Sequence, residues 1–430
     1  MDSINEIRVP MWDKMQFFCK NISDHQIRFV LHFDLHLDVE VLKNAFQITL
    51  ENNPIACAKY VEDKKKVLWE FFGCEMDKVF SLYECEVPDQ LIHEVVIEQL
   101  NTLSGPQLKL SLIRSKSDCL ILNCDHTISD AAGVKNFMYR LAENYGILSK
   151  NNEVIKQTCI PNRSLKALSG NMGLKEKWSV LKVMLLNKKS APTFTKNGEL
   201  NNLQNPGFKT YTINKFEFQK IKEFGKKYSA TVNDMLLAIY FFTLKKIVKN
   251  SNKTNRLTYS SDLRPYLINS AYDILSNYSA IHNIDINNTI NDFVPLLKGI
   301  SSLTKTRKQM KYDLADFPMM AMLFKTLPYN KLKSIFHKEF TKIKEGKSLA
   351  APSLTNMGII EPKRISFGNI TPEQVYMLGT INHPSLLQIA ISTYRQEVTI
   401  SVGSYYCGEN NKFILNFLKE FETTCKSEIL

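Results

Sequence analysis

The sequence lacks the marks of a membrane-anchored, exported or metal-binding protein. Its longest apolar run, MLLAIYFFTL from Met235 to Leu244, is about half of the roughly 20 residues that span a bilayer. The opening residues, MDSINEIRVPMWDKMQFF, show no basic-then-apolar signal pattern, so export is not expected. His32 and His36 have the spacing of ligands on a helix, but the alternating residues around them favour a strand. We therefore expect no metal site.

Cysteine pairs with a redox or zinc spacing are also absent. The nine cysteines are an odd number and contain no CxxC pair, which favours reduced, buried thiols in a cytoplasmic protein. Cys124 lies two residues before His126, but nothing in the sequence around it would activate a thiolate. A nucleophilic Cys124 is therefore not expected.

Acidic residues are too few to balance the basic ones. Against 43 aspartates and glutamates stand 55 lysines and arginines, giving a formal net charge of +12. No basic helix with interleaved aromatic residues and no RNA-binding motif is visible, so nucleic acid is not the expected partner. A ligand with phosphates or an acidic carrier protein suits the same charge.

Length and composition predict a globular protein of two domains. The chain has 430 residues, 44% of them hydrophobic and 23% charged. Strand and helix patterns occur in two sets, which predicts a mixed α/β (or α+β) protein. The first set comprises strands over 27–37 and 108–126 and helices over 39–54, 90–103 and 131–145. The second comprises a strand over 255–267, a helix over 291–310, a hairpin turning near 395–397 and a closing helix over 411–429.

A weakly patterned stretch rich in Asn, Lys, Ser and Gly separates the two sets. We place the first domain at 1–160, the connection at 161–205 and the second domain at 206–430. Inside the connection, LKEKWSVLKVMLLNKK over 174–189 predicts a basic amphipathic helix. Such a helix either packs on its own protein, which we favour, or lies on a membrane surface.

The segment CDHTISDAAG places His126 at the rim between a predicted strand and the helix that follows. A histidine there can act as a general base near neutral pH. It can equally be a hydrogen-bonded structural residue, with Asp130 as the N-cap of the helix. The residues alone leave both interpretations open.

HTISDAAG resembles the HxxxD motif of the acyltransferase superfamily that includes chloramphenicol acetyltransferase, plant BAHD acyltransferases, alcohol acetyltransferases and the condensation domains of nonribosomal peptide synthetases. The motif follows a hairpin strand, opens a helix and lies near residue 130, as in that superfamily. The stretches TVNDMLLAIYFFTL, SSDLRPYL and LTNMGII resemble further parts of the family pattern. The resemblance therefore covers nearly the whole chain.

The sequence departs from the family pattern in two ways. Condensation domains usually carry two adjacent histidines and a glycine directly after the aspartate. Here Asp125 stands in place of the first histidine, and Ala131 and Ala132 delay the glycine to Gly133. The DFGWG motif of the plant enzymes is also missing. The chain looks closest to stand-alone condensation-like or alcohol acetyltransferase-like proteins.

The resemblance implies two chloramphenicol acetyltransferase-like subdomains, each a mixed sheet flanked by helices, with a tunnel between them and residues 350–385 crossing near it. It implies an acyltransferase in which His126 is the base that moves an acyl group to an alcohol or amine acceptor. The donor would be acyl-CoA or a phosphopantetheinyl carrier protein, with no bound cofactor or metal. We expect a cytoplasmic monomer that acts on a small molecule.

We expect Asp130 to be structural and to pair with Arg264 of SSDLRPYL. A buried carboxylate needs a cation, and the planar fork of arginine can hold it with two hydrogen bonds. The family resemblance points to the same pair. The alternative is that Asp130 only caps its helix while Arg264 is solvated.

Thr355 and Asn356 are the residues we expect to stabilise the oxyanion or position the substrate, with Ser392 as a further candidate. The competing hypothesis for the whole chain is a non-catalytic relative that only docks a carrier protein or pathway partner. The intact His126, Asp130 and Arg264 favour the enzyme.

Overall fold

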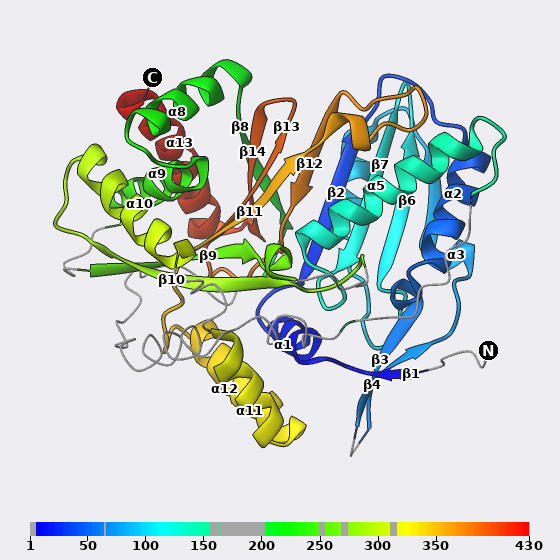
Figure 1. Ribbon diagram of the computed structural model, residues 1–430, viewed down its shortest axis with the longest axis horizontal. Helices are drawn as coiled ribbons and strands as arrows, with labels where there is room; N and C mark the ends of the chain where they lie inside the picture. Colours follow the sequence, from blue (N-terminus) through cyan, green and yellow to red (C-terminus); the bar gives the residue numbers. More distant parts are fainter. Residues whose placement is uncertain are drawn as a thin grey trace.

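Two β-sheets flanked by helices stand side by side in the computed structural model (Figure 1). The structure describes residues 6–63, 66–154, 163, 203–248, 254–267, 274–309 and 316–429. The predicted helix over 174–189 and most of the predicted connection lie outside these residues. The two-subdomain mixed α/β architecture expected from the sequence is confirmed.

The first sheet has five strands in the order β12-β2-β7-β6-β5. All neighbours are antiparallel except β5 and β6. The strands are β12 (Gln374–Leu378), β2 (Gln26–His32), β7 (Asp118–Asp125), β6 (Leu108–Arg114) and β5 (Phe80–Glu84).

Alternate residues of this sheet bury opposite faces. Phe29 and Leu31 of β2 belong to the core formed with α2 (Val39–Glu51) and α5 (Ala131–Leu148). Val30 points the other way, into a cluster with α4 (Pro88–Ile97). Because both faces of the sheet are covered, all residues of β7 are buried, and its centre is the apolar run from Cys119 to Leu122.

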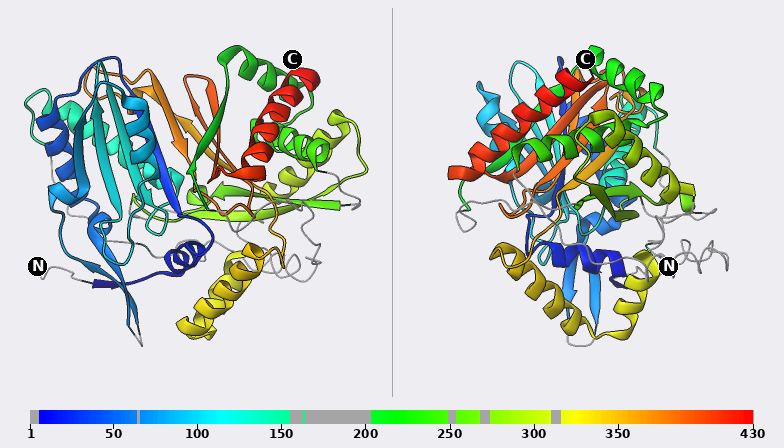
Figure 2. Two further views of the ribbon diagram at one scale, coloured as in Figure 1. Left: turned by 180° about the vertical axis from the view of Figure 1, so that it is seen from behind. Right: turned by 90° about the vertical axis from the view of Figure 1, so that its left-hand side faces the viewer.

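The second sheet has six strands in the order β10-β9-β11-β13-β14-β8. They are β10 (Ser279–Asn287), β9 (Thr254–Asp262), β11 (Ser353–Ile360), β13 (Gln388–Tyr394), β14 (Glu397–Tyr405) and β8 (Pro206–Ile213). Helices α8 (Lys215–Lys227), α9 (Val232–Ile247), α10 (Phe293–Gln309) and α13 (Gly408–Glu428) cover its side away from the first sheet (Figures 1 and 2). Thr231 and Asp234 form a capping box that starts α9.

The segment between β11 and β12 passes from one sheet to the other. β11 pairs with β13 and β9 in the six-stranded sheet, whereas β12 pairs with β2 in the five-stranded sheet. The short helix η4 (Pro362–Arg364) lies between them. This crossing falls inside the predicted range 350–385.

Several elements belong to neither of the two large sheets, and most of them lie beneath the sheets in Figure 1. They are the small sheet of β1 (Glu6–Arg8), β4 (Val67–Phe71) and β3 (Ala58–Glu62), the helices α1 (Met11–Cys19), α3 (Met76–Val79), α11 (Asp316–Thr326) and α12 (Tyr329–Lys344), and the short helices η1 (Pro54–Cys57) and η2 (Arg264–Tyr266). Phe18 of α1 packs against Tyr329 and Phe336 of α12.

Three sequence predictions need correction. The strand expected to reach residue 37 ends at His32, because the Asp118 carboxylate accepts hydrogen bonds from the Leu37 amide and His36 and bends the chain. The helix expected to reach residue 103 ends at Ile97, because the backbone of Glu98 leaves the helical conformation and its carbonyl accepts a hydrogen bond from Gln26.

The third correction concerns the cysteines, which were expected to be reduced. Cys57 and Cys74 form a disulfide, with their Cα atoms 5.3 Å apart. The close approach follows from the fold, because η1 ends beside the loop that follows β4 and the Phe72 amide donates to the Cys57 carbonyl. Persistent disulfides are typical of oxidising compartments, so this bond does not support the predicted cytoplasmic location.

No helix within the described residues has the length and apolar character needed to cross a bilayer.

Candidate active site

His126 lies in a tight turn between β7 and α5, at the junction of the two subdomains. Its backbone amide donates to the His25 carbonyl (2.9 Å), and the Thr127 amide donates to the Asp125 carboxylate (2.8 Å). The carbonyls of His126 and Thr127 both accept from the side chain of Asn277, which precedes β10 of the six-stranded sheet. The turn is thus held from both subdomains.

Asp130 both caps α5 and pairs with Arg264. Its Oδ1 accepts from the Gly133 amide (2.9 Å) and its Oδ2 from the Tyr278 amide (2.7 Å). Two nitrogens of Arg264 approach the two carboxylate oxygens at 2.9 and 3.0 Å. The residues that the sequence proposed as partners are therefore in contact, and Arg264 is not solvated.

The electrostatics of the pair favour a charged Asp130. Both side chains are buried, with exposed fractions of 5% for Asp130 and 8% for Arg264. Burial alone would raise the pKa of Asp130, but the Arg264 charge and the hydrogen bonds outweigh it and hold the pKa below its ordinary value.

Gly133 is required by its surroundings. A Cβ atom there would clash with the Ser129 hydroxyl and lie 2.7 Å from the Ile274 carbonyl oxygen. The delayed glycine of the motif therefore lets α5 start against the segment that leads into β10.

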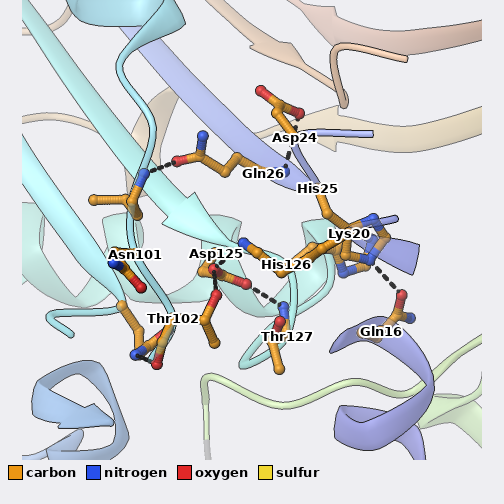
Figure 3. A network of polar contacts seen from close by, with 12 residues as sticks. Gln16, Lys20, Asp24, His25, Gln26, Asn101, Thr102, Asp125, His126 and Thr127 are labelled. Atoms are coloured by element: carbon orange, nitrogen blue, oxygen red, sulfur yellow. Dashed lines mark hydrogen bonds and ion pairs between the residues drawn. The ribbon is translucent and has the colours of Figure 1, made fainter. Parts of the chain in front are cut away.

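The His126 ring is half-buried and stacks on His25 from the start of β2 (Figure 3). Its Nδ1 atom is buried and has no hydrogen-bond partner among the described residues. Beside the ring, the Asp125 carboxylate accepts from Lys20 (2.6 Å) and Thr102 (2.5 Å). Asp125 thus has a structural role at the position where the family pattern has its first histidine.

Comparisons with known proteins come from structure alone. The sequence matches no protein-family model and no curated protein. The first condensation domain of the calcium-dependent antibiotic synthetase, in complex with a substrate analogue, is similar over 100% of this chain and 98% of its own, with 11% identity and a TM-score of 0.73. The chain has the condensation-domain fold.

Two further solved structures with this fold are an acetyltransferase and a starter condensation domain. The TRI3 trichothecene 15-O-acetyltransferase from Fusarium sporotrichioides matches over 98% of this chain and 95% of its own, at 13% identity and a TM-score of 0.67. A mutant starter condensation domain of rhizomide synthetase RzmA, in complex with C8-CoA, has the same coverage at 11% identity and a TM-score of 0.68.

Sequence reasoning missed a second buried cluster, which lies behind the turn that carries the motif. Arg163 donates to the carbonyls of Ile128 (2.7 Å) and Leu275 and to the Asp13 carboxylate (2.9 Å). It thereby ties the motif turn to α1 and to the lead-in of β10. An isolated arginine in an unpatterned stretch gave no local signal of this role.

The oxyanion candidates lie on β11 and β13 of the condensation fold. The Thr355 hydroxyl accepts from the Gln388 side chain (3.3 Å), and Oδ1 of Asn356 accepts from the Gly358 amide (2.9 Å). Ser392 is buried and accepts from the Met377 amide, which joins β12 to β13. No hydrogen bond within the described residues links these three to His126, and Thr355 and Asn356 are the more accessible candidates.

Cys124 cannot serve as an activated thiol in this environment. Its side chain is fully buried, and burial raises the pKa of the thiol well above its ordinary value. This agrees with the expectation from sequence.

A basic cavity of about 690 Å³ opens beside α5. Three of its lining residues are the cations Arg140, Lys363 and Arg364, and one is the anion Glu143, which pairs with Arg140 (2.9 Å). The Arg364 guanidinium lies over the Tyr139 ring at 4.2 Å. Lys363 is exposed. The cavity thus combines helix α5, which His126 precedes, with the crossing segment after β11.

Proposed function

We propose that this protein transfers an acyl group from a thioester donor to an alcohol or amine, with His126 as the general base. The observation that carries the proposal is the histidine turn itself, which is clamped by both subdomains of a condensation-type fold. The acetyltransferase and the CoA complex among the similar structures support the same class of reaction.

In this mechanism His126 removes the proton from the acceptor hydroxyl or amine as that atom attacks the thioester carbonyl carbon. The carbonyl oxygen becomes an oxyanion. When its double bond re-forms, the carbon–sulfur bond breaks and the thiolate leaves with the electron pair, taking the proton from His126. We assign the proton transfers to Nε2, because Nδ1 is buried. General base catalysis of this kind contributes roughly 10²- to 10⁴-fold.

The oxyanion would accept hydrogen bonds from the crossing strand β11. The Thr355 hydroxyl accepts from Gln388 and can still donate its hydrogen. The side-chain oxygen of Asn356 accepts from the Gly358 amide, and its NH2 group, which approaches Asn233 Oδ1 at 3.5 Å, has a second hydrogen to donate. Hydrogen-bond donors that are already in position stabilise the negative charge on the oxyanion without having to move during the reaction.

We place the phosphorylated end of the donor in the basic cavity beside α5. Phosphates need cations, and Lys363 and Arg364 offer them at the exposed end of the crossing segment. Both acyl-CoA and a phosphopantetheinyl carrier protein have the required charge. The domain ranges predicted from the sequence, 1–160 and 206–430 with a tunnel between them, belong to the same proposal, as does a monomeric state.

If the cavity binds the donor, Lys363→Ala combined with Arg364→Ala raises the KM for acyl-CoA severalfold at low salt. The KM for an acyl-pantetheine lacking the nucleotide stays constant, because that donor has lost the phosphates. Raising salt from about 50 to 500 mM has the same selective effect on the unmodified protein, since screening shortens the attraction.

Steady-state kinetics with both donors measure this difference. Lys419→Ala, at an exposed position on α13, is the matched control and leaves both KM values unchanged. Equal changes for the two donors, or no change for either, would rule out phosphate binding at this cavity.

The activity itself is tested by mass spectrometry of reactions that contain the purified protein, a panel of acyl-CoAs and a panel of small alcohols and amines. We expect an ester or amide whose mass equals acceptor plus acyl group minus water. If neither acyl-CoA nor acylated carrier proteins give product, while a carrier protein binds stoichiometrically, the chain is a docking protein and the proposal fails.

A further inference from the structure

His25 occupies an unusual backbone conformation beside the proposed base. It directly precedes β2, and its φ of 55° lies in the left-handed region that non-glycine residues rarely adopt. The residue is buried, with 7% of its surface exposed. Residues held in this way cluster at functional sites, where the surrounding structure imposes the conformation.

The rings of His25 and His126 form a parallel stack. Their centroids are 4.8 Å apart and their planes differ by 13°. Antiparallel pairing brings the two residues together, because Gln26 at the start of β2 lies opposite Asp125 at the end of β7. The His126 amide also donates to the His25 carbonyl, so the two residues are in contact through both their backbones and their rings.

Both nitrogens of the His25 ring have a polar partner, and the contact with Gln16 is seen in Figure 3. Nε2 lies 2.8 Å from the Gln16 side-chain oxygen, and Nδ1 lies 3.2 Å from the Ser23 hydroxyl. The Gln16 amide oxygen only accepts, so Nε2 carries a proton, and a neutral ring satisfies both contacts when Nδ1 accepts from the Ser23 hydroxyl. The His126 ring, by contrast, has no such anchor at Nδ1 among the described residues.

The charges around the pair also favour a neutral His25. Lys20 lies nearby and pairs with Asp125, and Asp24 pairs with Arg28. Burial lowers the pKa of His25 well below its ordinary value, and the nearby His126 and Lys20 lower it further.

We propose that His25 is a positioning residue for His126. Its neutral ring is held by hydrogen bonds, and the His126 ring is oriented by stacking on it. The proposal rests on the proposed function for its kinetic consequence, but the ring geometry is testable without it. A flat ring restricts its stacked neighbour to parallel orientations, whereas an aliphatic side chain of similar volume does not.

Three substitutions separate the ring from the backbone. His25→Phe keeps a ring, His25→Leu replaces it with an aliphatic group, and His25→Asn removes it with a residue that tolerates the left-handed conformation. We expect kcat to fall by on the order of 10- to 100-fold for His25→Leu and His25→Asn, because small misplacements of a catalytic group have such effects. His25→Phe should keep most of the kcat of the unmodified protein. The KM values of all three variants should stay within about twofold of the unmodified protein.

The second readout is the NMR spectrum of protein labelled at histidine. The His126 resonances, assigned from their loss in His126→Ala, carry the ring-current shift of a stacked neighbour in the unmodified protein and in His25→Phe. They move away from it in His25→Leu and His25→Asn. If these shifts are the same in His25→Leu as in the unmodified protein, or if His25→Phe loses as much kcat as His25→Asn, His25 does not position the base. If the unmodified protein transfers no acyl group, the proposed function fails and the NMR result alone decides this proposal.

Discussion

His126→Ala is expected to lower the rate of acyl transfer at least about 100-fold, the lower end of what a general base contributes. The protein should nevertheless fold normally. The hydrogen bonds that hold the turn use the backbone of His126, through its amide to His25 and its carbonyl to Asn277. Removing the ring loses only the stack on His25, which is worth about 1 kcal/mol.

Thermal denaturation and product formation should be measured on the same preparations. His93→Ala, which truncates an exposed histidine on α4, is the matched control and should leave both quantities unchanged. A His126→Ala protein that keeps more than about a tenth of the rate would exclude His126 as the base, since that loss is smaller than general base catalysis supplies.

Truncating either member of the Asp130–Arg264 pair should destabilise the fold by about 3 kcal/mol or more, because it leaves the partner charge buried and unpaired. Asp130→Ala should cost more than Arg264→Ala, since it also removes the cap of α5 and the acceptor for the Tyr278 amide. Activity should fall as well, because His126 lies four residues before Asp130 in the same turn.

A double-mutant cycle measured by chemical denaturation tests the coupling. The double variant should cost clearly less than the two single losses added together. If the single losses add to within about 0.5 kcal/mol, the two side chains do not interact energetically despite their contact.

The same pair makes a prediction about acid stability. The pKa of Asp130 in the folded protein lies below its ordinary value of 3.8, so the pair stabilises the fold fully above that value. The contribution is lost as pH falls from about 4 through the lowered pKa. Asp130→Asn should therefore be less stable than the unmodified protein at neutral pH, with the difference shrinking below about pH 4. A pH-independent difference would mean that the Asp130 charge is not stabilising.

Much of this site follows from sequence because its parts lie at the ends of regular elements. The hairpin of β6 and β7 and the capped start of α5 place His126 and Asp130 on opposite sides of one turn. Pro265 and the polar corner after β9 mark Arg264 as a strand-end cation. Each of these signals can be read from a few neighbouring residues. A buried carboxylate also needs a cation as its partner, which links Asp130 to Arg264 although they are far apart in the sequence.

The rest of the site could not be found locally. Arg163 and Asn277 reach the motif from segments without periodic pattern, and their contacts cross more than 30 and 150 residues of chain, respectively. His25 did carry a signal, since it stands in a polar corner before a strand, as His126 stands after one. That signal becomes informative only when β2 is known to pair antiparallel with β7, which depends on the whole fold.

Direct transfer without an acyl-enzyme is the central claim, and mass spectrometry of reactions quenched during turnover tests it most directly. The small-molecule fraction reports the acylated acceptor, and the intact-protein fraction reports any acyl group attached to the chain. We expect product that requires both substrates and His126, together with protein of unmodified mass at every time point. An acyl adduct on the protein that forms and decays as fast as product appears would contradict the account.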